Sequence, residues 1–218
     1  MTGTADPTGT EALSVRLRAG TRAEHDAAEG DGFLSGLAAG RLPRAAYANL
    51  VAQHFFIYES LESAAQAMAD DPVAGVFVFP ELTRLPSLIA DLEFLYGPDW
   101  ADRIAAVPAT ASYCARLRSV AFDQPPAFLA HHYTRYLGDL SGGQHIGRAV
   151  ADGYGFAADG WRFFQFDGVD PGAFRSRYRA QLDAVSWQPG QEQQFLAEVT
   201  QAYRLNVAVL HELGQRCT

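Results

Sequence analysis

Helical periodicity runs through almost the whole chain and constrains its fold more than any other feature. Apolar residues recur three and four positions apart, and no segment shows the strict alternation of a half-buried strand. Clusters of Gly, Pro and Asp separate the periodic segments, and residues 155–171 are the least helical part. We expect helices at residues 11–29, 44–69, 80–96, 98–104, 108–120, 125–151, 172–185 and 190–214.

These helices are expected to form one unit, because neither a low-complexity linker nor an internal repeat divides the 218 residues. The pattern predicts a single-domain, all-α multi-helix bundle over residues 11–214. The polar residues 1–10 are expected to be a disordered tail, and residues 215–218 a short C-terminal tail.

Charge and cysteine content exclude several classes of protein. The net charge of −8 argues against a nucleic-acid partner, which needs a dense positive surface. Cys114 and Cys217 lie far apart and form neither a disulfide framework nor a zinc-ligand spacing, so we expect a reducing cytoplasm. No signal-peptide pattern and no apolar stretch of about 18 residues is present, so no membrane anchor is expected.

The first predicted helix has one unusual stripe of polar residues. Arg18, Arg22, His25 and Glu29 are spaced by four, three and four, which places them within an arc of about 60°. A neutral imidazole there can bind a haem iron while its other nitrogen donates to Glu29, directly or through water. The two arginines can pair with the anionic haem propionates. The alternative is a partly buried histidine beside a solvated charged face.

A later helix contains glycines that weaken it. Gly138, Gly142 and Gly143 each cost a helix interior roughly 1 kcal/mol relative to alanine. Gly138 and Gly142 share one face, where the backbone can approach a flat ligand closely, and the Gly142-Gly143 pair permits a kink. A tight helix–helix crossing also favours small residues and is the alternative explanation.

The segment around these glycines, residues 133–144 (YTRYLGDLSGGQ), resembles the distal-helix signature of haem oxygenases. Further similar segments follow in the order of that family and extend the resemblance over about residues 11–214. Residues 21–29 resemble the proximal helix that supplies the iron ligand. The other matching positions are Tyr58, Arg175, Tyr178, Arg179, Tyr203 and Asn206.

The resemblance implies a kinked distal helix and a proximal helix with haem between them. It also implies an enzyme that cleaves haem, its substrate and cofactor, to biliverdin, CO and ferrous iron with O2 and external electrons. A non-catalytic haem carrier or sensor on the same fold is the alternative. A carboxylate-bridged di-iron bundle is disfavoured because no histidine has a glutamate three residues before it. A cysteine hydrolase is disfavoured because neither cysteine has a convincing nucleophile setting.

Residue roles follow from the resemblance. His25 is the expected iron ligand and Glu29 its partner. Asp139 is expected to deliver protons through ordered water, beside the bare backbone of Gly138 and Gly142. The residues expected to hold that water are Tyr58, Arg135 and Asn206. The residues expected to bind the propionates are Arg18, Arg22, Arg175 and Arg179, and those expected to line the haem pocket are Gly143, Tyr133 and Tyr203.

The remaining histidines are not assigned to the site. His131 and His132 are expected to pack or face solvent, His54 and His211 to be structural, and His145 to lie outside the site.

An electron donor is implied as a partner, because the sequence has no dinucleotide-binding glycine turn after a strand. Ferredoxin or a flavin reductase is expected in this role. A monomer or weak homodimer is expected. The sequence leaves three purposes open, which are iron acquisition, haem detoxification and bilin supply.

Overall fold

The computed structural model describes residues 11–20 and 32–217, except for the side chain of Arg18. This part of the chain is helical and contains no strand. The helices are α1 (Leu13–Gly20), α3 (Gly32–Ala38), α4 (Arg44–Ala67), α5 (Leu85–Tyr96), α6 (Trp100–Arg103), α7 (Pro108–Val120), α8 (Pro125–Gly138), α9 (Gln144–Tyr154), α10 (Pro171–Asp183) and α11 (Gln191–Gln215). Three short 3₁₀ turns, η1 (Gly75–Phe77), η2 (Pro80–Leu82) and η4 (Arg162–Phe164), and one π-helical turn, η3 (Asp139–Gly143), complete the described elements.

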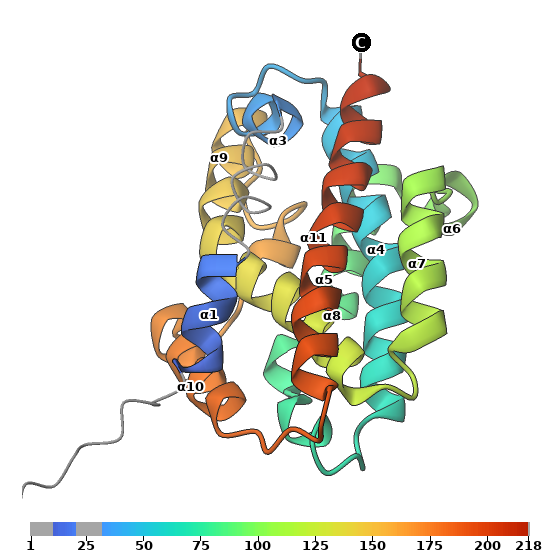
Figure 1. Ribbon diagram of the computed structural model, residues 1–218. Coiled ribbons are helices and arrows are strands. Elements are labelled where there is room, and N and C mark those ends of the chain that lie inside the picture. The colour runs from blue at the N-terminus through green and yellow to red at the C-terminus, as the bar shows by residue number, and fades with distance from the viewer. Residues whose placement is uncertain (1–10, 21–31, 218) are drawn as a thin grey trace, which may run out of the picture.

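The long helices α4 and α11 run side by side with α7 and α8, while α9, α1 and α10 form the opposite side of the molecule (Figure 1). Fully buried side chains from these helices and from η4 make up much of the core, and each contributes about 1.5–3 kcal/mol through burial. The largest include Tyr47, Ile57, Phe128, Phe163 and Phe195. The prediction of an all-α bundle is confirmed.

Two of the predicted helix positions are wrong. No helix was expected between residues 29 and 44, but α3 begins at Gly32 and buries Phe33 and Leu37. The expected helix over 80–96 is two elements, because the chain is not helical at residues 83–84. The buried carboxylate of Glu62 accepts the Arg84 backbone N–H at 2.5 Å and the Leu85 N–H at 3.3 Å, so it satisfies donors at the start of α5.

The segment around η4 packs against α9. Buried Asp91 accepts the backbone N–H groups of Arg162 at 2.9 Å and Phe163 at 2.8 Å. Burial raises the pKa of Asp91 to about 6. A Cβ at Gly147 would lie 2.4 Å from the Phe164 Cβ, so α9 packs on η4 as closely as a bare backbone allows. The tertiary contact therefore explains this glycine.

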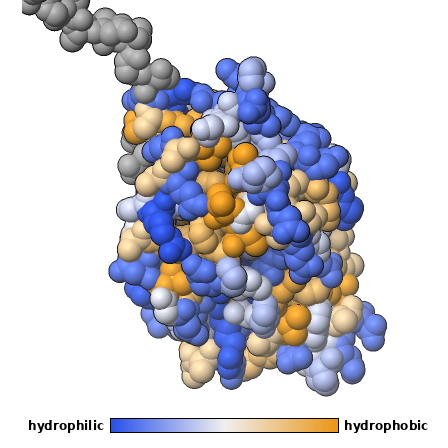
Figure 2. All heavy atoms as spheres, turned by 90° about the horizontal axis from the view of Figure 1, so that it is seen from below, coloured by the Kyte–Doolittle hydropathy of each residue, from blue (hydrophilic) through white to orange (hydrophobic). Residues whose placement is uncertain are grey.

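No described helix has an apolar stretch long enough to cross a bilayer. Seen from below, apolar residues appear in patches among hydrophilic ones (Figure 2). The large hydrophobic side chains exposed in the described part are Val15, Val76, Phe94 and Phe122.

A buried polar network connects α8 to α11 and α7. His131 is fully buried, and its Nε2 lies 2.9 Å from Glu198 Oε1. Arg116 donates to both oxygens of the same carboxylate, at 2.9 and 2.5 Å. Burial alone would raise the pKa of Glu198, but the hydrogen bonds from His131 and Arg116 outweigh it and hold this pKa at about 2.

The Glu198→Gln variant is expected to be less stable by about 2 kcal/mol at pH 7, because a charged acceptor of three hydrogen bonds is lost. The native pKa of Glu198 lies below its ordinary value of 4.5, so its contribution is present above pH 4.5 and lost as the pH falls toward 2. Urea denaturation at pH 7 and pH 3 should therefore give a smaller difference between wild type and variant at pH 3.

Glu192→Gln on the same helix is the control. Glu192 pairs with Arg16 near the surface, so this variant should lose less than about 1 kcal/mol. A difference between wild type and Glu198→Gln that stays constant with pH would contradict the assigned pKa.

Candidate functional site

The glycine-containing helix continues without a break but changes its hydrogen-bonding register. α8 and α9 are joined by η3, a five-residue π-helical turn. The sequence predicts a kink at Gly142-Gly143, and the structure places a π-helical turn there instead. Such turns are rare and occur frequently at functional sites. The inserted residue also changes the phase of α9 relative to α8, and His145 is exposed.

Two of the three glycines expose bare backbone. Gly138 and Gly142 are exposed, and a Cβ added to either would meet no described atom within 4 Å. Gly143 is different, because it is buried and its added Cβ would contact Asp139 Cβ at 3.6 Å and Phe164 Cδ1 at 3.7 Å. Among the described residues, close helix packing therefore explains Gly143 but not Gly138 or Gly142.

The carboxyl group of Asp139 lies at the start of this turn. Fully buried Tyr58, on α4, donates a hydrogen bond to Asp139 Oδ2. Burial raises the pKa of Asp139, and the positive charge of Arg135 opposes this rise. Burial and the neighbouring Asp139 charge raise the pKa of Tyr58 well above its ordinary value, so the phenol stays protonated as the donor.

Arg135 connects this carboxyl group to α11. Its Nη1 donates to Asn206 Oδ1 at 2.6 Å, and its guanidinium carbon lies 5.0 Å from the centre of the Tyr58 ring. The Nε and Nη2 atoms of Arg135 are buried without a hydrogen-bond partner in the described part of the chain. Buried donors of this kind bind ordered water. The four predicted water-network residues, Tyr58, Arg135, Asp139 and Asn206, are thus brought together.

Two members of this cluster are absent from the sequence-based prediction. The Tyr136 ring lies 5.4 Å from that of Tyr58, and its hydroxyl donates to Glu62 Oε1 at 3.3 Å. Burial raises the pKa of Glu62. The signal was available, because Glu62 follows Tyr58 by four residues and so shares its helix face.

The basic segment of α10 lies against the same turn. Arg175 Nη1 donates to the Leu140 carbonyl oxygen at 2.5 Å and to Ser141 Oγ at 3.1 Å. Arg179 is half-exposed one turn later. Tyr133 is buried with its ring 6.1 Å from that of Tyr178, while Tyr203 on α11 is half-buried. Propionate binding by the two arginines stays a prediction.

The proximal side is only partly described. α1 buries Leu13 and Leu17, as a core-facing first helix should. The expected iron ligand His25, its partner Glu29, and Arg22 lie outside the described residues, and so does the side chain of Arg18. Their roles stay predictions. α1 lies beside α10, which also contacts η3 (Figure 1).

The other histidines take structural or surface positions. His131 and His132 are buried, so of the two expected positions, packed or facing solvent, they take the packed one. His54 is also buried, 4.8 Å from the Phe163 ring, and burial lowers its pKa so that it is neutral. His211 is exposed and accepts a hydrogen bond from Gln215 Nε2 at 2.9 Å.

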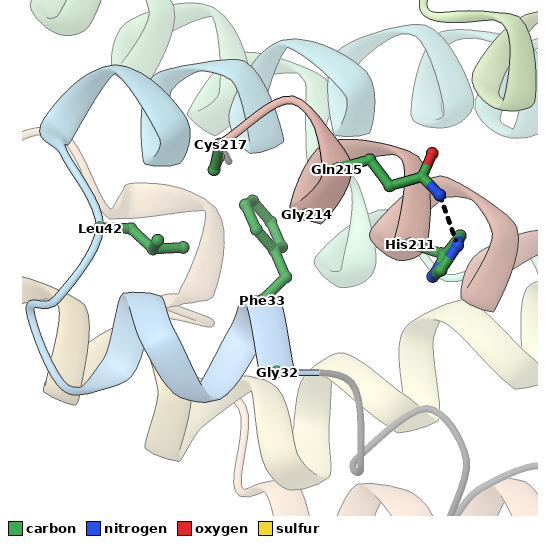
Figure 3. Close-up of a pocket in the computed structure, with 7 residues that line it drawn as sticks. All are labelled: Gly32, Phe33, Leu42, His211, Gly214, Gln215 and Cys217. Atoms are coloured by element: carbon green, nitrogen blue, oxygen red, sulfur yellow. Dashed lines mark hydrogen bonds between the residues drawn. The ribbon is translucent and has the colours of Figure 1, made fainter.

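A cavity of about 410 Å³ lies between α3 and the end of α11 (Figure 3). The residues lining it are Gly32, Phe33, Leu42, His211, Gly214, Gln215 and Cys217. None of them belongs to the cluster around the glycine turn.

The comparisons with known proteins agree with this geometry. The family model described as "Heme oxygenase" matches residues 11–212. The heme oxygenase of Porphyra purpurea is 36% identical over 205 residues, covering 93% of this chain and 86% of the relative. Heme oxygenase 1 of Synechocystis sp. is 33% identical over 202 residues, covering 92% and 84%.

Solved structures show the same similarity in three dimensions. The structure of heme oxygenase-1 from Synechocystis sp. in complex with heme matches with a TM-score of 0.89 and 32% identity, covering 95% of this chain and 94% of that one. The heme oxygenase of Leptospira interrogans matches with a TM-score of 0.87 and 34% identity, covering 93% and 100%. The chain therefore belongs to the haem oxygenase family.

Proposed function

We propose that this chain binds haem between its first helix and the glycine turn η3 and cleaves it oxidatively to biliverdin, CO and ferrous iron. The observation on which the proposal depends is a bare backbone surface at Gly138 and Gly142, directly beside the Asp139 carboxyl group. A flat ligand covers such a surface without a steric clash, and a carrier protein has no need of the adjacent proton donor.

The residues present fit haem. His25 would hold the iron with Glu29 as its partner, and Arg18, Arg22, Arg175 and Arg179 would hold the propionates. Gly143, Tyr133 and Tyr203 would support the haem pocket. Bound haem supplies an iron centre that reacts with O2.

The chain's own residues then control space and protons at that centre. The bare turn leaves room for a small diatomic molecule that a side chain would displace. Burial raises the pKa of Asp139 and so favours its protonated form, and the Tyr58 hydroxyl fixes the direction of the carboxyl group. The buried donors of Arg135, which Asn206 orients, would position water beside Asp139 for proton transfer.

Electrons must come from outside the chain. We propose a cytoplasmic ferredoxin or flavin reductase as the donor, because the sequence contains no dinucleotide-binding glycine turn.

The test is to mix the purified chain with hemin, record the absorption spectrum, and add reductant under air. We expect a haem-complex spectrum followed by biliverdin and CO. His25→Ala should abolish the native axial coordination. Stable hemin binding without bilin or CO would favour a carrier or sensor and contradict the proposed reaction.

Asp139→Asn should keep the hydrogen bond from Tyr58 but remove the acidic proton. We expect hemin affinity to stay within about threefold and the rate of biliverdin formation to fall about 10²-fold, the usual contribution of a general acid. The wild-type rate should decline as the pH rises through the raised pKa of Asp139, and the variant should lack this decline. An unchanged bilin yield in the variant would remove Asp139 from the mechanism.

Gly142→Ala and Gly142→Leu should separate folding from ligand binding. An added Cβ meets no described atom within 4 Å and improves helix propensity by up to about 1 kcal/mol, so the Tm of the haem-free chain should stay the same or rise. Hemin affinity should fall, by at least about tenfold for leucine, since its side chain fills part of the ligand space.

Gly153→Ala is the matched control, because its Cβ makes only an ordinary contact of 3.5 Å with Gly40. This variant should bind hemin like the wild type. A lower Tm with unchanged hemin binding in the Gly142 variants would show that this glycine serves helix packing.

A further inference from the structure

The hydrogen bonds of Arg175 point to a role that the propionate assignment does not include. Its Nη1 donates to the Leu140 carbonyl oxygen at 2.5 Å and to Ser141 Oγ at 3.1 Å, both within η3. Arg175 is half-buried on α10, more than thirty residues further along the chain. A charged donor from another helix therefore holds the turn at the residues between Gly138 and Gly142.

The opposite end of α10 contacts the first helix. Asp183 accepts hydrogen bonds from the Ser14 backbone N–H and from Ser14 Oγ, both at 2.7 Å. α1 has no acidic residue in its own first turn, so Asp183 supplies the carboxylate that a helix N-terminus favours.

The middle of α10 is fixed in the core. Tyr178 is fully buried, and its hydroxyl lies 2.9 Å from His132 Nδ1 on α8. The two rings are stacked with their centres 5.7 Å apart. At its start, the Asp170 side chain accepts the Ala173 N–H at 2.7 Å. A capped helix of 13 residues spans about 20 Å, and these contacts fix its position against α8.

We propose that α10 sets the separation between α1 and the glycine turn, and that Arg175 is a positioning residue for that turn. The proposal rests on the proposed function in one respect only, which is that the space between α1 and the glycine turn is the haem site. A guanidinium has five N–H donors, and the two bonds to η3 use one nitrogen. The remaining donors stay available to a propionate, so positioning and ligand binding are compatible.

Amide hydrogen exchange on the full haem-free chain tests the positioning role. Arg175→Met removes both bonds and keeps an unbranched apolar side chain. We expect amides of residues 140–144 to exchange about tenfold faster, the loss typical for a hydrogen bond from a charged group. Arg175→Lys should restore most of the protection, because an ammonium group can still donate to the Leu140 carbonyl. Amides of the α4 core should exchange as in the wild type.

Arg179→Met is the matched control, since it removes the same charge one turn away and Arg179 makes no hydrogen bond to the described residues of η3. It should leave exchange in residues 140–144 unchanged. Equal exchange in wild type and Arg175→Met would overturn the proposal, and lower hemin affinity in that variant would then assign Arg175 to the propionates alone.

A spectroscopic measurement adds a second readout. In the hemin-loaded chain, the midpoint pH of the ferric acid–alkaline transition should shift in Arg175→Met and return toward the wild-type value in Arg175→Lys. If neither variant shifts the midpoint, the turn is not positioned through Arg175. If the wild type fails to bind hemin, the proposed function fails, while the exchange result still decides how the turn is held.

Discussion

The structure depends on a helix that passes through a glycine-rich π-helical turn without breaking. Three glycines weaken helix formation by roughly 1 kcal/mol each, and the π register is itself unfavourable relative to an α-helix. Neighbouring residues stabilise the turn on the side that faces the protein interior. Phe164 packs beneath Gly143 and Gly147, and Arg175 binds the Leu140 carbonyl from α10. The ligand-facing side is left bare at Gly138 and Gly142.

The carboxyl group of Asp139, beside the bare turn, needs polar partners of its own. Asp139 can have a raised pKa only where it is shielded from water, yet an isolated buried carboxyl group would be costly. Tyr58 satisfies one oxygen and the Arg135 charge opposes the effect of burial. The result is a carboxyl group with a raised pKa and a fixed orientation. A separate network joins His131 on α8 to Glu198 on α11. Its hydrogen bonds are made within the network, and it contributes to stability.

Support from remote segments is a recurring feature of this fold. Glu62 on α4 satisfies the start of α5, and Asp91 on α5 fixes η4 below the glycine turn. α10 contacts both α1 and η3. Each of these contacts joins segments distant in sequence, so the site geometry is a property of the whole bundle. Family membership, shown over residues 11–212, accounts for the fold, while these contacts describe how this chain maintains it.

The sequence by itself determined the helical class and the approximate helix positions, because periodicity is a local signal. The grouping of Tyr58, Arg135, Asp139 and Asn206 was expected only from the resemblance to haem oxygenases, since Tyr58 and Asn206 lie outside the twelve-residue motif. The proximal residues His25 and Glu29 also come from the sequence and stay predictions. Only the tertiary structure decided the π-helical register of η3, the break at residues 83–84, and the bond from Arg175 to Leu140. Each of these depends on a partner far away in the chain, such as Glu62 for Arg84. Local propensity contains no information about which distant group will satisfy a backbone donor or acceptor, and for that reason these features required the folded chain.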